Sequence, residues 1–294
     1  MERPFEVPAE LYPFRSRWQV VGGLPVHYVD EGEGPPVLFL HGNPTWSFLY
    51  RDVIRELRGS CRSIALDYPG MGMSGKPRLH GRPDYGFTPE EHSRVVEGFV
   101  EALDLHDLTL MVQDWGGPIG LAVAARQRRR VARLVIANTW GWPAEELDMK
   151  IFSFLLGRFP GPLLIRYRNF FVETVLPLGV EKKERLTPAV MAAYRAPYAA
   201  PVDRRPTAVF PRAIVASRAF LADVEAGLES LRQLPAAIIW AKKDKAFRKR
   251  ELERWRALFP AAPLTLIPDA GHYLQEDAPQ AIAAAVRSFL GLPG

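Results

Sequence analysis

The chain has 294 residues, of which 48% are hydrophobic and 24% charged, so it can bury a large core and is not a disordered protein. Its formal charge of +5 is mild, and the basic clusters at 126–130 and 242–250 lack a nucleic-acid-binding motif, so we interpret them as solvated surface and expect no nucleic-acid partner. Cys61 is the only cysteine, which excludes an internal disulfide and a Cys-rich zinc site.

Short apolar runs predict buried strands at 26–29, 37–40, 62–66, 108–113, 134–137, 236–240 and 264–267. Helical patterns lie between most of these runs. The capping box Thr88-Pro-Glu-Glu91 predicts a helix that ends near Ala102, and further helices are expected after Trp115, Phe247 and Pro279. This alternation predicts an α/β fold with helices on both faces of a mostly parallel sheet.

The alternation stops between about residues 141 and 211, where any periodicity is helical. We predict that residues 141–211 form a helical lid at the carboxyl ends of the strands, where open α/β sheets bind ligands. Residues 1–140 and 212–294 would form the core. Packing within the lid or the lining of an apolar pocket would each explain its aromatic and aliphatic residues, namely Phe152, Phe154, Leu155, Phe170, Phe171 and Val172.

Asp114 directly follows the run at 108–113 and precedes Gly116 and Gly117. A strand that turns sharply into a helix raises the turn residue above the sheet, which is the nucleophile-elbow geometry with Asp in the usual place of Ser. An Asp that only caps the helix is the alternative. The sequence His41-Gly-Asn-Pro44 follows another strand, where such hydrolases contribute a backbone N–H to the oxyanion hole.

His272 is the one histidine among six that follows the last predicted strand, which is the place of a general base in this fold. A base needs an orienting carboxylate, and Asp244 lies between the nucleophile and the histidine in chain order. Asn138 occupies the other candidate position but has no charge to stabilise an imidazolium. The spacing of the histidines predicts no metal site.

Residues 70–77, GMGMSGKP, satisfy GxGxxG and most of the P-loop pattern. Pro77 replaces the hydroxyl residue that would hold Mg²⁺, and the flanking prolines favour a loop over a helix. We therefore expect no phosphate-binding cofactor here. The N-terminal segment lacks an apolar targeting core, and the most apolar stretch is too short to span a bilayer, so we expect a cytoplasmic protein without a membrane partner.

The chain resembles haloalkane dehalogenases of the α/β-hydrolase fold in five core segments: HGNPTWSFLYR (41–51), DYPGMGMSGKP (67–77), QDWGGPIG (113–120), WAKKDKAF (240–247) and GHYLQEDAP (271–279). The resemblance is weak in the lid. It implies an eight-stranded sheet, Asp114 as nucleophile, His272 as base and Asp244 as its partner. It also implies that Trp115 and Asn43 bind the halide, as in the branch with an acid after the seventh strand.

The resemblance implies hydrolysis of a small apolar haloalkane to alcohol, halide and proton through an ester of the nucleophile, with no metal or organic cofactor. One alternative is an epoxide hydrolase with the same triad, which would need acidic hydroxyls from Tyr167, Tyr194 or Tyr198. Asn43 favours the dehalogenase. A luciferase-like monooxygenase and a non-catalytic binding protein are further alternatives. Substrate size, halide preference and oligomeric state are not encoded in a recognisable pattern.

Overall fold

The computed structural model describes residues 1–77 and 85–293 and contains a central sheet of eight strands: β1 (Arg17–Val21), β2 (Leu24–Glu31), β3 (Pro36–Leu40), β4 (Arg62–Leu66), β5 (Leu108–Gln113), β6 (Val131–Ala137), β7 (Ala236–Ala241) and β8 (Leu264–Ile267). The strand order is β1-β2-β4-β3-β5-β6-β7-β8. β2 pairs antiparallel with β1 and β4, and all other pairs are parallel. The predicted mostly parallel α/β sheet is confirmed.

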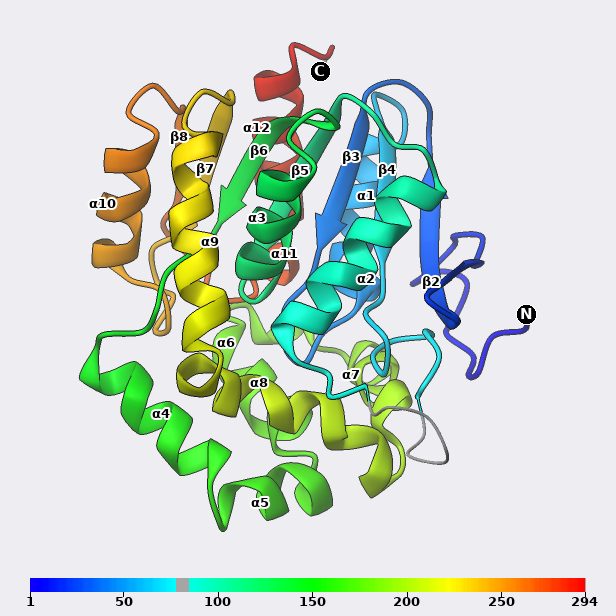
Figure 1. The fold of residues 1–294 in the computed structure, drawn as a ribbon. Helices are drawn as coiled ribbons and strands as arrows, with labels where there is room; N and C mark the ends of the chain where they lie inside the picture. Colours follow the sequence, from blue (N-terminus) through cyan, green and yellow to red (C-terminus); the bar gives the residue numbers. More distant parts are fainter. Residues whose placement is uncertain (78–84, 294) are drawn as a thin grey trace.

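Helices cover both faces of this sheet (Figure 1). In front lie α2 (Pro89–Ala102), α3 (Gly116–Arg126) and α9 (Arg218–Leu231), while α1 (Arg51–Leu57), α11 (Leu274–Asp277) and α12 (Pro279–Leu290) lie behind. α10 (Lys249–Leu258) lies near the edge formed by β8. Because both faces are covered, β5 and β7 are buried along their whole length, which explains their continuous apolar runs.

Local sequence signals explain where several elements begin and end. Thr88 Oγ1 accepts the Glu91 backbone N–H at 3.3 Å, and the Glu91 carboxylate accepts the Thr88 N–H at 2.9 Å, so the predicted capping box opens α2. That helix ends at Ala102, as predicted. β1 was not predicted, because its side chains are only half-buried or exposed and produce no apolar run.

Between β6 and α9 the chain forms helices beneath the carboxyl ends of the strands (Figure 1): α4 (Leu147–Gly157), α5 (Gly161–Arg168), α6 (Leu176–Gly179), α7 (Pro188–Arg195) and α8 (Arg205–Ala216). Short 3₁₀ and π turns connect them. α8 continues through Pro211. No helix in residues 1–77 and 85–293 has the length and apolarity required to cross a bilayer.

A buried carboxylate links the middle of the lid segment to the loop that carries His272. Asp277 accepts backbone N–H groups of Glu181 at 3.0 Å and of Lys182 at 2.8 Å, both in the lid. The same carboxylate accepts the N–H of Gly271, next to His272, at 2.8 Å. The lid and the histidine loop therefore share one hydrogen-bonded anchor.

A second buried acid strengthens this attachment. Glu276 accepts a hydrogen bond from Arg51 Nη2 of α1 at 2.7 Å and another from the hydroxyl of Tyr194 on α7. Removing one partner of such a buried pair leaves an unpaired charge and destabilises a protein strongly. Core, lid and histidine loop are thus joined at this point.

Candidate active site

Asp114 stands at the sharp turn between β5 and α3, where the sequence places it. Its φ of 51° lies in the left-handed region, which Asp tolerates better than most residues. Two hydrogen bonds hold the turn: Asp114 N–H donates to Asn138 O at 3.1 Å, and the Thr139 hydroxyl donates to Asp114 O at 2.6 Å. A Cβ at Gly116 would lie 2.2 Å from the Leu40 carbonyl oxygen, so the close start of α3 requires glycine.

The loop after β3 supplies a fixed donor to the Asp114 carboxylate. The backbone N–H of Asn43 donates to Asp114 Oδ1 at 2.9 Å. A Cβ at Gly42 would lie 2.1 Å from the same oxygen, so only glycine allows this approach. Trp115 is the N-cap of α3, and its N–H belongs to the first amides of the helix, which have no acceptor within it. One oxygen of Asp114 is therefore held, while the other is left for chemistry.

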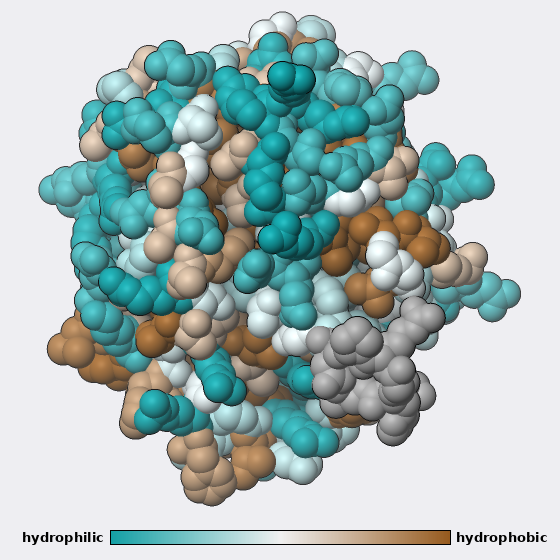
Figure 2. Space-filling model, in the orientation of Figure 1, coloured by the Kyte–Doolittle hydropathy of each residue, from teal (hydrophilic) through white to brown (hydrophobic). Residues whose placement is uncertain are grey.

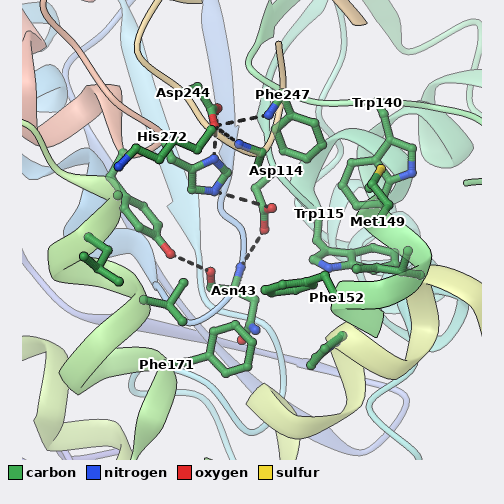
Figure 3. Close-up of a pocket in the computed structure, with 18 of the residues that line it drawn as sticks. Asn43, Asp114, Trp115, Trp140, Met149, Phe152, Phe171, Asp244, Phe247 and His272 are labelled. Carbon is green, nitrogen blue, oxygen red and sulfur yellow. Dashed lines mark hydrogen bonds and ion pairs between the residues drawn. The ribbon is translucent and has the colours of Figure 1, made fainter. Parts of the chain in front are cut away.

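His272 lies between the two acids (Figure 3). Its Nδ1 is 3.0 Å from Asp244 Oδ2, and its Nε2 is 3.6 Å from Asp114 Oδ2. Asp244 is fixed in turn, because its Oδ1 accepts the backbone N–H groups of Ala246 at 2.7 Å and Phe247 at 3.2 Å. The structure thus brings all three predicted triad residues together.

The charges around His272 control its protonation. Burial lowers the pKa of His272, but the carboxylates of Asp244 and Asp114 outweigh that effect and raise the pKa to about 10. The ring is therefore protonated at neutral pH. His41 behaves in the opposite way, because burial lowers its pKa to about 4 and its Nδ1 contacts Gly42 O at 3.0 Å. His41 is a neutral structural residue.

Replacing Asp114 by Asn is expected to lower the pKa of His272, because it removes a negative charge near Nε2. An NMR titration of the imidazole measures this, with the exposed Asp269→Asn as control. A pKa that stays unchanged in Asp114→Asn would contradict the electrostatic coupling between the two residues.

The raised pKa of His272 also predicts how stability depends on pH. Because the pKa in the folded protein, about 10, exceeds the value of 6.5 in the unfolded chain, the charged ring stabilises the fold fully below pH 6.5. This stabilisation is lost as the pH rises through about 10.

A cavity of about 320 Å³ lies between Asp114 and the lid. Its lining is mainly apolar and includes Trp140, Met149, Phe152, Phe171, Val175, Leu178, Pro211, Ile214 and Phe247. Such a cavity suits a small apolar ligand with few polar groups. Among the described residues, no group of three His, Cys, Asp or Glu side chains is arranged to hold a metal ion.

The side chains of Trp115 and Asn43 both line this cavity. The Trp115 ring packs between Trp140 and Phe210, with centroid distances of 4.6 and 5.2 Å, which fixes its orientation. Figure 3 shows its indole nitrogen on the side facing Asn43 and Asp114. Asn43 Nδ2 donates one proton to Thr207 O at 3.2 Å, which leaves the second proton free. Trp115 and Asn43 therefore offer two neutral N–H donors to the cavity that Asp114 also lines.

The lid residues divide between the cavity and the surface. Phe152 and Phe171 line the cavity. Phe154 and Leu155 do not, because they lie on the outer side of α4 and are 58% and 59% exposed. Phe170 and Val172 also lie outside the lining, and Val172 is buried in the core cluster instead. A pocket role for these last four residues is therefore wrong.

The three tyrosines that an epoxide hydrolase would need do not line the cavity. Tyr167 is 58% exposed, Tyr194 donates to Glu276, and Tyr198 is fully buried. The tyrosine that does line the cavity is Tyr273, whose hydroxyl donates to a backbone carbonyl at 3.0 Å. No lid tyrosine in the described chain is therefore available to an epoxide oxygen.

Two residues support the triad in ways that the sequence analysis did not predict: Asn138, which it only excluded as the acid, and Gln113. Asn138 donates from Nδ2 to Asp244 Oδ2 at 3.0 Å, and its Oδ1 accepts the N–H of Ala241 at 2.7 Å. Gln113 donates from Nε2 to the carbonyl of His272 at 3.1 Å. Gln113 ends β5 and Asn138 directly follows β6. Polar residues at the carboxyl ends of neighbouring buried strands were the signal that could have identified them.

Comparison with known proteins agrees with this architecture. The family model described as the alpha/beta hydrolase fold matches residues 35–279. The crystal structure of a haloalkane dehalogenase from Bradyrhizobium elkani superimposes with a TM-score of 0.85 at 26% sequence identity, over 95% of this chain and 98% of that chain. The fold and the elbow define the class as α/β hydrolases.

Relatives of known name indicate which family of α/β hydrolases the chain resembles. Haloalkane dehalogenase 2 of Mycobacterium tuberculosis is 46% identical over 293 residues, which are 99% of this chain and all of the relative. A cis-3-alkyl-4-alkyloxetan-2-one decarboxylase of Shewanella oneidensis is 32% identical, over 95% of this chain and 89% of that protein. The chain belongs to the haloalkane dehalogenase family of α/β hydrolases.

Proposed function

We propose that this chain hydrolyses the carbon–halogen bond of small apolar haloalkanes and releases an alcohol, a halide ion and a proton. The observation that supports this most is that the carboxylate of Asp114 lines an apolar cavity together with the neutral donors Trp115 and Asn43, with only Oδ1 held by the backbone. A carboxylate attacks carbon without a base, and a departing halide needs fixed donors. The relative at 46% identity is named for this activity.

In the first step, Asp114 Oδ2 attacks the carbon that carries the halogen, in line with the bond that breaks. Oδ1 stays on the Asn43 backbone N–H and becomes the carbonyl oxygen of the alkyl ester. The leaving halide takes the bonding electron pair and receives the indole N–H of Trp115 and the amide N–H of Asn43. The lid keeps water away from this step, which strengthens these interactions.

In the second step, the ester has removed the charge of Asp114, so the pKa of His272 falls and the ring releases its proton to solvent. Neutral Nε2 then takes a proton from a water molecule, whose oxygen attacks the ester carbonyl carbon. The backbone N–H groups of Asn43 and Trp115 stabilise the oxyanion. When the oxyanion collapses, the acyl C–O bond breaks and the alcohol leaves with the proton from Nε2. The proton of the remaining carboxylic acid passes to Nε2, which restores the Asp114 carboxylate and the imidazolium. Asp244 orients the ring throughout and stabilises the imidazolium.

The proposal also assigns roles to the two parts of the chain. Residues 141–211 act as the lid, and residues 1–140 and 212–294 act as the catalytic core. In this proposal Asn43 is the second halide donor, and the chain would belong to the branch that has its acid after the seventh strand. The cytoplasmic location stays a prediction.

Replacing Trp115 by Phe keeps an aromatic ring but removes the indole donor. Loss of one such donor costs about 10²- to 10³-fold in rate. We therefore expect kcat/KM for 1-bromohexane to fall by about 10²-fold and inhibition by added bromide to weaken. Trp142→Phe, at a position outside the cavity lining, is the control. Equal losses in the two variants would contradict a halide role for Trp115.

A halide-release series over 1-bromoalkanes of increasing length tests the proposed function. Each buried methylene contributes about 0.8 kcal/mol, so kcat/KM is expected to rise by up to about fourfold per added carbon. The rise should end when the cavity is full, at roughly ten non-hydrogen atoms if each occupies about 30 Å³.

The same series should include two substrates of the alternative activities. An alkyl epoxide is assayed for the diol, and a dialkyl oxetan-2-one is assayed for carbon dioxide. Absence of halide release from every bromoalkane would contradict the proposal. Faster turnover of the epoxide or the oxetanone would also contradict it.

A further inference from the structure

The outer surface of the lid is strongly apolar. Among the exposed large side chains of α4, α5 and their connection, six form what we call the apolar lid face: Leu147, Ile151, Phe154, Leu155, Phe159 and Leu163. Leu147 is 72% exposed and Phe159 84%. Figure 2 shows hydrophobic residues gathered at this lower end of the molecule. A contiguous apolar patch of this kind marks an interaction site.

The helix that carries most of this face turns large apolar side chains toward solvent. Only Ser153 of α4, a polar residue, is fully buried. Leu147, Ile151, Phe154 and Leu155 of the same helix are exposed. This is the reverse of the usual surface helix, whose apolar side faces the core, so the apolar lid face can accept a partner that covers it.

Cations surround the apolar lid face and lack acidic partners. Within the described chain no ion pair forms with four exposed side chains of α4, α5 and their connection, namely Lys150, Arg158, Arg166 and Arg168. The one acid of this stretch, Asp148, is already paired with Arg248. The surface thus combines apolar side chains with free positive charge.

We propose that α4 and α5 bind the surface of a membrane that contains anionic lipids. Apolar side chains would enter the boundary between headgroups and acyl chains, and the four cations would contact the headgroups, as in interfacial helices. A second copy of this chain fits less well, because a two-fold interface places the same patch on both partners and would bring like charges together. Anionic lipid offers the complementary charge.

The cavity lies beside α4 but is not lined by the apolar lid face. Phe152 of α4 and Leu178 of α6 line the cavity and are 40% and 62% exposed, and the charged side chains of Asp148, Glu181, Lys243 and Lys245 line it as well. The membrane proposal therefore rests on the apolar lid face and its cations, and membrane binding does not depend on the proposed activity.

Co-sedimentation of the full chain with vesicles of phosphatidylcholine, with and without phosphatidylglycerol, tests the proposal. We expect binding to the vesicles that contain phosphatidylglycerol and weaker binding at high salt. The double variant Phe154→Ser/Leu155→Ser is expected to bind at least about tenfold less. Arg166→Gln/Arg168→Gln is expected to lose about fivefold per cation.

Matched controls are Val20→Ser on β1 and Arg129→Gln beyond the end of α3, both exposed and distant from the lid. Both are expected to bind vesicles as the original chain does. The Phe154→Ser/Leu155→Ser variant should still release halide from a dissolved bromoalkane, because neither residue lines the cavity. If halide release fails in every protein but vesicle binding holds, only the proposed activity is overturned.

Two outcomes would overturn the membrane proposal. One is that the original chain stays in the supernatant with both kinds of vesicle. The other is a dimer in sedimentation velocity that dissociates in Phe154→Ser/Leu155→Ser, since a second copy would then cover the apolar lid face.

Discussion

The His272→Phe variant is expected to release one halide ion per protein molecule and then stop. Attack by Asp114 needs no base, so the first step continues, but no group remains to activate water against the ester. A rapid-mixing halide assay should show a burst of one equivalent. Mass spectrometry after exposure to a bromoalkane should show one added alkyl group, mapped to the peptide that contains Asp114.

His106→Phe is the matched control, because His106 is an exposed histidine distant from the cavity lining. This variant should turn over continuously and retain no alkyl group. A folded His272→Phe protein with steady turnover, or one with no adduct, would contradict the two-step route.

The Asp114→Asn variant is expected to lose at least about 10⁴-fold in kcat, which is the scale of removing one member of a catalytic triad. Asn has the shape of Asp and also accepts a left-handed backbone, so the elbow should stay folded. The neutral amide is a poor nucleophile, and neither a halide burst nor an alkyl adduct should appear. Steady-state halide release and intact mass measure both effects.

Asp107→Asn controls for the backbone conformation, because Asp107 also has a positive φ, 49°, in an exposed loop. It should retain the original rate. An Asp114→Asn protein with more than about a hundredth of the original activity would show that another group attacks the substrate.

Sequence alone was sufficient for seven of the eight strands and for the meeting of the triad. Buried strands have continuous apolar runs, and parallel strands end at one edge, so residues directly after them converge there. Asp114, Asp244 and His272 each follow such a strand. Gly42 and Gly116 also indicate the site, because a Cβ at either position would clash with the atoms around Asp114 or Leu40.

The lid could not be predicted to the same depth. Apolar residues predominate in α4, so its sequence pattern does not distinguish Phe152, which lines the cavity, from Phe154, which faces solvent. The environment of Tyr194 depends on Glu276, which is 82 residues away in the chain. Long-range partners of this kind leave no local pattern. β1 was not predicted because it is an edge strand whose side chains are exposed or half-buried, so it has no apolar run.

The carboxylate of Asp277 couples the lid to the position of the general base. Because it accepts the backbone N–H groups of Glu181 and Lys182 together with that of Gly271, the neighbour of His272, a movement of this part of the lid would also move the histidine loop. A substitution that removes this carboxylate would therefore loosen the cover of the cavity and the catalytic base at the same time.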